Sequence, residues 1–419
     1  MPMSNAALAA AQSVDGERLW SRLMQMAEIG AIPGNGVNRP CLSADDIRAR
    51  TLLISWAAAR GWQVGVDRAA NLFIRLPGTE PDAEPIVTGS HMDTQPQGGR
   101  FDGIYGVIAG LEALEAIRAS GVPVRRPIDV VAWTNEEGGR FAPGAMGSAV
   151  FTGAAGLDRF TPVKDGDGVE FGKALKETLA ATPDAARRNF NFPIAGYVEA
   201  HIEQGPRLEA EEKTIGVVTG IQGCRWFVVE VSGETGHAGT SPVKTRKDAL
   251  RESVAMISAL QDLMADPSDT IRFTVGRVEV SPNTHNSVPE RVRFTIDFRH
   301  PNPILLNDRG DRIADLCHEV ADACTVEVNE VLTLAPIRFP EEVVGTIEAA
   351  AEGLGERSMR MPSGAFHDSQ YLAAVCPSAM IFIPCEKGIS HNPAEYASQK
   401  DCAAGARVLA ATLVELANR

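Results

Sequence analysis

The sequence has few of the features that mark secreted, membrane-bound or cysteine-based metal proteins. Its seven cysteines are an odd number and contain no Cys-x-x-Cys pair, which argues against a disulfide framework and against a cysteine-based zinc site. No apolar run approaches the ~20 residues that a membrane helix needs. Residues 1–20 lack the basic start and long apolar core of a signal peptide. We therefore expect a cytoplasmic protein without a membrane partner.

Positive charge is also scarce. The chain has 40 Lys and Arg against 54 Asp and Glu, with a formal net charge of -14. A nucleic-acid partner is excluded on this basis, because phosphate contacts need clustered Lys and Arg. The hydrophobic share of 44% is ordinary for a globular protein, and 419 residues exceed what one core usually supports. Two domains are therefore expected.

Strands and helices alternate in the first part of the chain. Apolar residues at helical spacing and short apolar runs predict helices at 17–31, 44–60 and 107–119 and strands at 71–76, 85–91 and 128–135. This alternation implies an α/β layer with a largely buried sheet, whose active groups lie at the carboxyl ends of its strands. His91 and Glu136 fall at such ends.

The middle of the chain has a different pattern. It predicts strands at 226–231, 271–280, 290–298 and 325–332, with helices at 246–264 and 307–323. The order β-α-β-β-α-β is that of a ferredoxin-like α+β domain, placed at 223–336. The α/β pattern then returns, with helices at 341–354 and 398–417 and a strand at 378–383. We expect a discontinuous catalytic domain, residues 1–222 and 337–419, with a central mixed sheet flanked by helices.

A glycine-rich loop follows the strand that ends at His91. The segment Gly89-Ser-His-Met-Asp93 precedes Gly98-Gly-Arg-Phe-Asp-Gly103. A histidine and a carboxylate on one such loop suit zinc-like divalent metals. Asp93 is two residues from His91, and we expect it to orient an imidazole rather than to bind metal.

The adjacent pair Glu136-Glu137 follows the apolar run Val130-Val-Ala-Trp133. Two carboxylates at a buried strand end repel each other and lose solvation, which is costly unless a cation or a proton compensates. A metal ligand beside a general base would give that compensation. A solvated loop pair is the alternative.

The segment 197–206 alternates polar and apolar residues, as in a half-buried strand, and would place Glu199, His201 and Glu203 on one face. His201 could bind a metal and Gln204 could bind a substrate. A histidine in a strand is, however, more often only hydrogen-bonded.

Further polar groups lie on loops and in the inserted domain. His367 and His391 lie on loops bracketed by glycine and, for His391, proline. His237 and Asn286 could stabilise an oxyanion. Arg299, which ends an apolar strand, could hold a carboxylate with both arms of its guanidinium group or form a surface ion pair.

Eight motifs together resemble a known family. They are GSHMDTQPQGGRFDG, WTNEEGGRFAPGAMGS, HIEQGP, GETGHAGTSP, NTHNSVPE, DFRH, SGAFHDS and GISHNPAEY, spread over residues 89–396. They resemble the amidase, hydantoinase and carbamoylase branch of the zinc aminoacylase and carboxypeptidase-like metallopeptidases. That branch includes N-carbamoyl-L-amino-acid hydrolases, β-ureidopropionases and allantoate amidohydrolases.

The resemblance implies a two-metal site. Asp102 would bridge two divalent ions, His91 and Glu137 would be terminal ligands on different ions, and His201 and His391 would complete the set. The ions would be zinc, with manganese, cobalt or nickel as alternatives. Glu136 would be the general base.

The resemblance also implies how substrate is held. His237, reaching the active site of a partner subunit, would share in catalysis. Substrate contacts would come from Gln204, Asn286, Arg299, Gly364 and His367. The inserted domain would act as a lid and as the dimer contact of a homodimer. Phe366 departs from the more familiar Gly-His-Asp-Ala motif and could alter the pocket wall.

The expected reaction is hydrolysis of the carbamoyl (ureido) C–N bond of N-carbamoyl-L-amino acids or N-carbamoyl-β-alanine. An allantoate or ureidoglycolate amidohydrolase is the first alternative, and an aminoacylase or dipeptidase the second. A metal-free binding protein on the same fold is a further alternative, but it would be expected to have lost a ligand or Glu136.

Overall fold

The computed structural model describes residues 2–419, which divide into two compact units. Unit 1 comprises the chain up to residue 219 and residues 339–419, and unit 2 comprises residues 220–338. The expected insert of residues 223–336 therefore begins three residues later and ends two residues earlier than unit 2. No helix within residues 2–419 is long and apolar enough to cross a membrane. All seven cysteines are free and buried.

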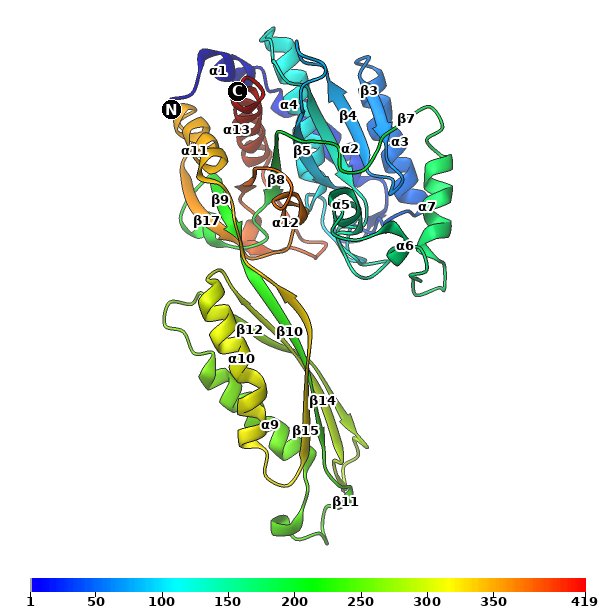
Figure 1. The fold of residues 1–419 in the computed structure, drawn as a ribbon, viewed down its shortest axis with the longest axis vertical. Helices are drawn as coiled ribbons and strands as arrows, with labels where there is room; N and C mark the ends of the chain where they lie inside the picture. Colours follow the sequence, from blue (N-terminus) through cyan, green and yellow to red (C-terminus); the bar gives the residue numbers. More distant parts are fainter. Residues whose placement is uncertain (1) are drawn as a thin grey trace. The chain divides into compact units, whose positions relative to one another are not determined.

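Unit 1 is built on a mixed sheet (Figure 1). Its strand order is β16-β9-β18-β8-β5-β6-β4-β3-β7, with β17 paired to β9. The strands are β3 (Gln63–Val66), β4 (Leu72–Leu76), β5 (Ile86–His91), β6 (Ile128–Trp133), β7 (Ala186–Arg187), β8 (Gly196–Ile202), β9 (Ile215–Ile221), β17 (Ser358–Ser363) and β18 (Ser378–Ile383). The edge strand β16 (Ile337–Arg338) pairs with the last two residues of β9, and these four residues fall within the bounds of unit 2. β1 (Ala31–Ile32) and β2 (Gly36–Val37) form a separate pair.

The four central strands run parallel. β5 pairs in parallel with β6 and β8, and β8 pairs in parallel with β18. The outer strands β4 and β9 are antiparallel to their central neighbours. The carboxyl ends of β5, β6, β8 and β18 therefore lie at the same edge of the sheet.

Helices cover both faces of this sheet (Figure 1). Gly110 of α4 lies against Thr88 of β5 and Val130 of β6. The adjacent residues of the same two strands, Val87 and Val131, lie in a cluster with Leu372 of α12. Neighbouring residues of a strand point to opposite faces, so α4 and α12 lie on opposite sides. The helices of unit 1 are α1 (Asn5–Gln12), α2 (Gly16–Ala27), α3 (Ala44–Ala58), α4 (Ile104–Ser120), α5 (Met146–Thr152), α6 (Leu157–Phe160), α7 (Phe171–Ala180), α8 (Arg207–Ala210), α11 (Glu341–Gly353), α12 (Ser369–Leu372) and α13 (Gln399–Ala417).

Two expectations about unit 1 need correction. β8 is not half-buried, because all seven of its residues are buried between β5 and β18 and under helices. The amino-terminal helix α1 was not expected. Its buried face consists of Ala7, Ala10 and Ala11, and a face of small alanines gives only a weak apolar periodicity.

Unit 2 has the element order β-α-β-β-α-β. Its four-stranded sheet has the order β12-β14-β10-β15 and is antiparallel throughout. Both long helices pack on one face, where Met256, Phe294 and Ile313 are fully buried. The elements are β10 (Gly223–Ser232), α9 (Ala249–Leu263), β12 (Arg272–Ser281), β14 (Arg291–His300), α10 (Pro303–Val320) and β15 (Thr325–Leu334), with the short pair β11 (Gly236–His237) and β13 (Ser287–Val288).

Helix α10 begins four residues before the expected start at 307. Asn302 caps it by accepting the N–H groups of Ile304 and Leu305, and Pro303 occupies the first turn. Asparagine as cap followed by proline is a known start signal for helices, so this boundary was readable from the sequence.

Candidate active site

The common edge of the parallel strands brings the predicted metal ligands together. His91 is the last residue of β5, Glu136 and Glu137 follow β6, and His201 lies one residue before the end of β8. The chain leaving β18 leads to His391. In open α/β sheets the carboxyl ends of strands form the ligand-binding edge, and this geometry explains why residues 300 positions apart in the chain meet.

Asp102 lies at the centre of these side chains. Its Oδ1 is 3.2 Å from Nε2 of His201 and 3.8 Å from Nε2 of His91. Its Oδ2 is 3.3 Å from Nε2 of His391, which is also 3.4 Å from Oε2 of Glu137. The donors therefore form two groups that share Asp102. We call His91, Asp102 and His201 group A, and Asp102, Glu137 and His391 group B; the ligand atoms of each group lie within 4.8 Å of one another.

The hydrogen bonds of two imidazoles show that group A fits a divalent metal ion. Nδ1 of His91 lies 2.9 Å from the carbonyl oxygen of Asp93, and Nδ1 of His201 lies 2.9 Å from that of Ile202. A carbonyl only accepts, so each Nδ1 carries a hydrogen, and in the neutral imidazole the lone pair is then on Nε2, the nitrogen nearer to Asp102. The N–H of Gly103 also points at Nε2 of His201, at 3.1 Å. Lone pairs that face a carboxylate call for a cation between them.

The buried carboxylates support the same conclusion. Burial and the charges of Asp368 and Glu137 raise the pKa of Glu136 well above its usual range. Burial and the charge of Asp102 raise the pKa of Glu137 to about 8. Oε2 of Glu136 lies 3.4 Å from Nε2 of His91. Divalent cations held by groups A and B would relieve this repulsion, with Glu136 left beside them and not committed to either group.

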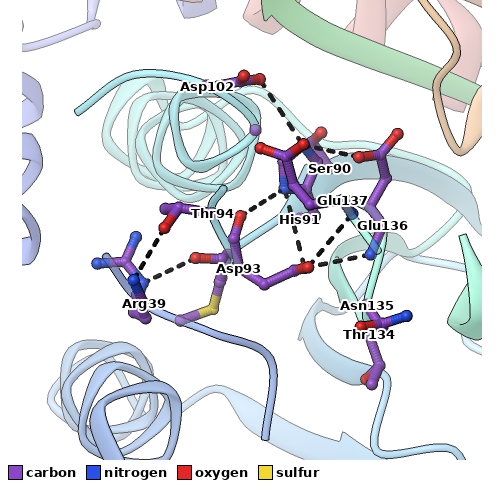
Figure 2. A network of polar contacts seen from close by, with 12 residues as sticks. Arg39, Ser90, His91, Asp93, Thr94, Asp102, Thr134, Asn135, Glu136 and Glu137 are labelled. Atoms are coloured by element: carbon purple, nitrogen blue, oxygen red, sulfur yellow. Dashed lines mark hydrogen bonds and ion pairs between the residues drawn. The ribbon is translucent and has the colours of Figure 1, made fainter. Parts of the chain in front are cut away.

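Asp93 acts differently from the expectation that its side chain orients an imidazole. The backbone carbonyl of Asp93 holds His91, whereas its carboxylate accepts the N–H groups of Glu136 and Glu137, each at 3.2 Å (Figure 2). The nearest carboxylate oxygen lies 3.9 Å from Nδ1 of His91. The chain turns after β5, so the side chain points toward the end of the neighbouring strand β6. Asp93 therefore ties together the ends of β5 and β6.

Glu395 was not singled out from the sequence, yet it positions Asp102. Its Oε1 accepts the N–H groups of Phe101 and Asp102, both at 3.0 Å, and its Oε2 accepts the hydroxyl of Ser390. A Cβ atom at Gly99 would overlap this carboxylate, so glycine is required there. The only sequence signal was an acidic residue four positions after His391.

Gln204 and Glu203 are neighbours with separate roles. The amide of Gln204 donates to Oδ2 of Asp102 at 3.0 Å and to the hydroxyl of Ser390 at 3.2 Å. Glu203 does not share the face of His201, because its carboxylate accepts the N–H groups of Arg207 and Leu208 and so caps α8.

His367 is buried, and its ring packs on that of His201. It is 2% exposed, its Nε2 contacts the hydroxyl of Ser363 at 2.9 Å, and the centroids of the two rings are 4.6 Å apart. Glu199, also fully buried, accepts the hydroxyl of Ser90 at 2.7 Å. Gly364 is exposed on the adjoining loop.

The other predicted residues belong to unit 2. His237 and Asn286 are exposed, and the pairing of β11 with β13 brings them together, the N–H of Ala238 donating to the carbonyl of Asn286. Arg299 contacts Asp297 through two hydrogen bonds of 2.9 and 2.8 Å. Of the two roles that the sequence left open for Arg299, an ion pair or a contact to a substrate carboxylate, the structure shows the ion pair with Asp297.

Comparison with known proteins defines the family of this fold and site. The family model described as Peptidase family M20/M25/M40 matches residues 87–415. The chain belongs to this family, which is metal-dependent.

Individual relatives narrow the branch. The N-carbamoyl-L-amino-acid amidohydrolase of Rhizobium meliloti is 40% identical over 410 residues, covering 96% of this chain and 97% of the relative. The allantoate amidohydrolase of Escherichia coli (strain K12) is 35% identical, covering 94% and 96%. The crystal structure of an amidase of the hydantoinase/carbamoylase family from Burkholderia multivorans has a TM-score of 0.91 at 42% identity, covering 97% of this chain and 98% of that one. These comparisons confirm the family resemblance of the eight motifs, and the chain is an amidohydrolase acting on C–N bonds of linear amides.

Proposed function

We propose that this amidohydrolase cleaves the carbamoyl C–N bond of N-carbamoyl-L-amino acids or N-carbamoyl-β-alanine, a linear amide bond. The products would be the amino acid, carbon dioxide and ammonia. The observation that carries the proposal is the pair of donor groups that share Asp102, with the uncommitted carboxylate of Glu136 next to them. The identity with N-carbamoyl-L-amino-acid amidohydrolases supports the choice of substrate class.

Two divalent ions per subunit, zinc or alternatively manganese, cobalt or nickel, would be held by groups A and B. Such ions supply positive charge that polarises a carbonyl oxygen and acidifies water. His91 and His201 are held in the required tautomer by backbone carbonyls. Glu395 and Gln204 fix Asp102 between the two groups.

Glu136 would act as the general base. Its carboxylate would take a proton from the attacking water and deliver it to the nitrogen that leaves as the C–N bond breaks. The backbone N–H of Glu136 donates a hydrogen bond to the carboxylate of Asp93. This contact anchors the backbone of Glu136 and leaves its side chain free to exchange a proton. The buried site keeps bulk water away from this transfer, since Glu136 is 8% exposed.

Unit 2 would contribute the rest of the substrate contacts. His237 and Asn286 would stabilise the negative charge that develops on the carbonyl oxygen. Arg299 would bind the substrate carboxylate through guanidinium N–H groups. Unit 2 would serve as a lid and as the contact of a homodimer in the cytoplasm, with His237 reaching the partner's site. In unit 1, Gln204 and Gly364 would contact substrate, whereas His367, predicted from the sequence to do so as well, is 2% exposed and would instead support His201, on which its ring packs.

Allantoate is the second candidate substrate, favoured by the identity with the Escherichia coli allantoate amidohydrolase. Ureidoglycolate belongs with it, and N-acetyl amino acids and dipeptides form the third candidate group. The deciding experiment measures product release by the zinc-reconstituted enzyme from each of these substrate classes. The expected result is the highest kcat/KM for N-carbamoyl-L-amino acids or N-carbamoyl-β-alanine. Preference for allantoate would select the second candidate, and activity only on N-acetyl substrates would overturn the carbamoyl assignment.

A further inference from the structure

Groups A and B differ in how firmly their own side chains are enclosed. In group A the side chains of His91, His201 and Asp102 are 2%, 1% and 4% exposed. In group B the side chain of His391 is 50% exposed and its residue has a positive φ of 53°. Because His391 is half exposed, group B depends strongly on how well its other unshared ligand, Glu137, is positioned.

Gln95 makes three hydrogen bonds to Glu137. Its side-chain amide donates to Oε2 at 2.9 Å and to the backbone carbonyl of Glu137 at 3.1 Å. Its own backbone N–H donates to Oε1 at 3.3 Å. Both carboxylate oxygens and the backbone of one residue are thus held by a single neighbour, which restricts the rotation of the Glu137 side chain.

The backbone of Gln95 is itself immobilised. Thr94, the preceding residue, donates its N–H to the carbonyl of Arg39 at 3.1 Å and accepts the N–H of Arg39 at 2.8 Å. The N–H of Gly98 donates to the carbonyl of Gln95 at 3.0 Å. Arg39, 1% exposed, also donates to the carbonyl of Met92 at 2.7 Å. A fixed backbone on both sides lets the short side chain of Gln95 transmit a defined position to Glu137.

We propose that Gln95 is a positioning residue for group B: it holds Glu137 in the orientation that completes the second ion's ligand set, and it has no equivalent effect on group A. This inference rests on the proposed two-ion function. Partners that orient ligands in this way typically change metal affinity by about 10–100-fold. Gln95 would set how readily the enzyme loses one of its two ions.

The test compares Gln95→Met, which keeps the side-chain length and removes the amide, with Gln97→Met. Gln97 is two residues further along the same loop and exposed. Each chain is loaded with Zn²⁺ alone and dialysed against a graded series of chelator, and bound zinc per chain is measured by elemental analysis. We expect Gln95→Met to lose one ion at about 10–100-fold lower chelator concentration than the unaltered chain, to keep the other, and Gln97→Met to match the unaltered chain.

Coincident zinc-loss curves for Gln95→Met and the unaltered chain would overturn the inference. Simultaneous loss of both ions by Gln95→Met would also overturn it, because the effect would then extend to group A. Gln95→Leu provides a second variant that also removes the amide, and it should lose a single ion over the same range of chelator concentration as Gln95→Met. An unaltered chain that binds fewer than two zinc ions would instead overturn the proposed two-ion site.

Discussion

At the scale of single residues, the site contains backbone conformations that cost free energy. Asn135, Gln204 and His391 have φ values of 58°, 56° and 53°, and such non-glycine residues cost about 1–3 kcal/mol each. The side chain of Asn135 compensates by donating to the carbonyls of Phe141 and Pro143. The surrounding contacts therefore impose the turn that presents the Glu136-Glu137 pair.

Replacing Glu136 by Gln should separate proton transfer from metal binding. The amide has nearly the same shape but cannot accept a proton from water, so we expect ammonia release to fall by about 10²–10⁴-fold. Because Glu136 belongs to neither donor group, the zinc content should stay at the value of the unaltered chain. Substantial remaining turnover would refute the role of general base.

At the scale of elements, helix α4 is bounded by glycines whose positions have different consequences. Gly103 precedes the helix with a φ of 66°, and Gly121 follows it with a φ of 69°. A Cβ atom at Gly103 would overlap the imidazole of His91, whereas a Cβ atom at Gly121 would meet nothing within 4 Å. Only the first glycine allows the helix to begin against the metal site.

The pair of variants Gly103→Ala and Gly121→Ala tests this difference. Gly121→Ala should cost about 1 kcal/mol, since alanine disfavours a positive φ, and should leave zinc binding unchanged. Gly103→Ala should cost more and should also weaken zinc binding, because the added methyl group displaces His91. The free energy of unfolding and the zinc content are measured for both. Equal zinc content in the two variants would contradict the role of Gly103.

At the scale of the whole molecule, the residues of the proposed reaction belong to two units. All donors of groups A and B belong to unit 1, and His237, Asn286 and Arg299 belong to unit 2. The family match from 87 to 415 includes residues of both units. Metal binding and substrate binding should therefore respond to different substitutions.

Arg299→Ala should raise KM by about tenfold or more, since a hydrogen bond to a charged group is worth about 1.5–3 kcal/mol, and should change kcat much less. The matched control is Arg293→Ala on the same face of β14, where Arg293 pairs with Glu279. The measurement is steady-state kinetics with the preferred carbamoyl substrate. A KM for Arg299→Ala equal to that of the control would refute the carboxylate contact.

Local patterns in the sequence were sufficient to predict most elements and to indicate a candidate metal site. The strand at 378–383 agrees with β18, and the helix at 44–60 covers all of α3 and runs two residues past its end. Buried strands and long amphipathic helices leave periodic apolar patterns that depend only on neighbouring residues. The Glu136-Glu137 pair after an apolar strand already indicated a cation, since charge next to a buried strand is costly wherever the chain goes.

Tertiary structure alone decided which groups touch. Glu395 positions Asp102 from 293 residues away, Gln95 holds Glu137 from 42 residues away, and the carbonyl rather than the carboxylate of Asp93 orients His91. The spacing of residues along a chain carries no record of these contacts, because they depend on where separate strands end and how the loops between them turn. The sequence by itself thus determined the elements and the chemical types at the site, whereas the path of the chain determined the partners of each donor.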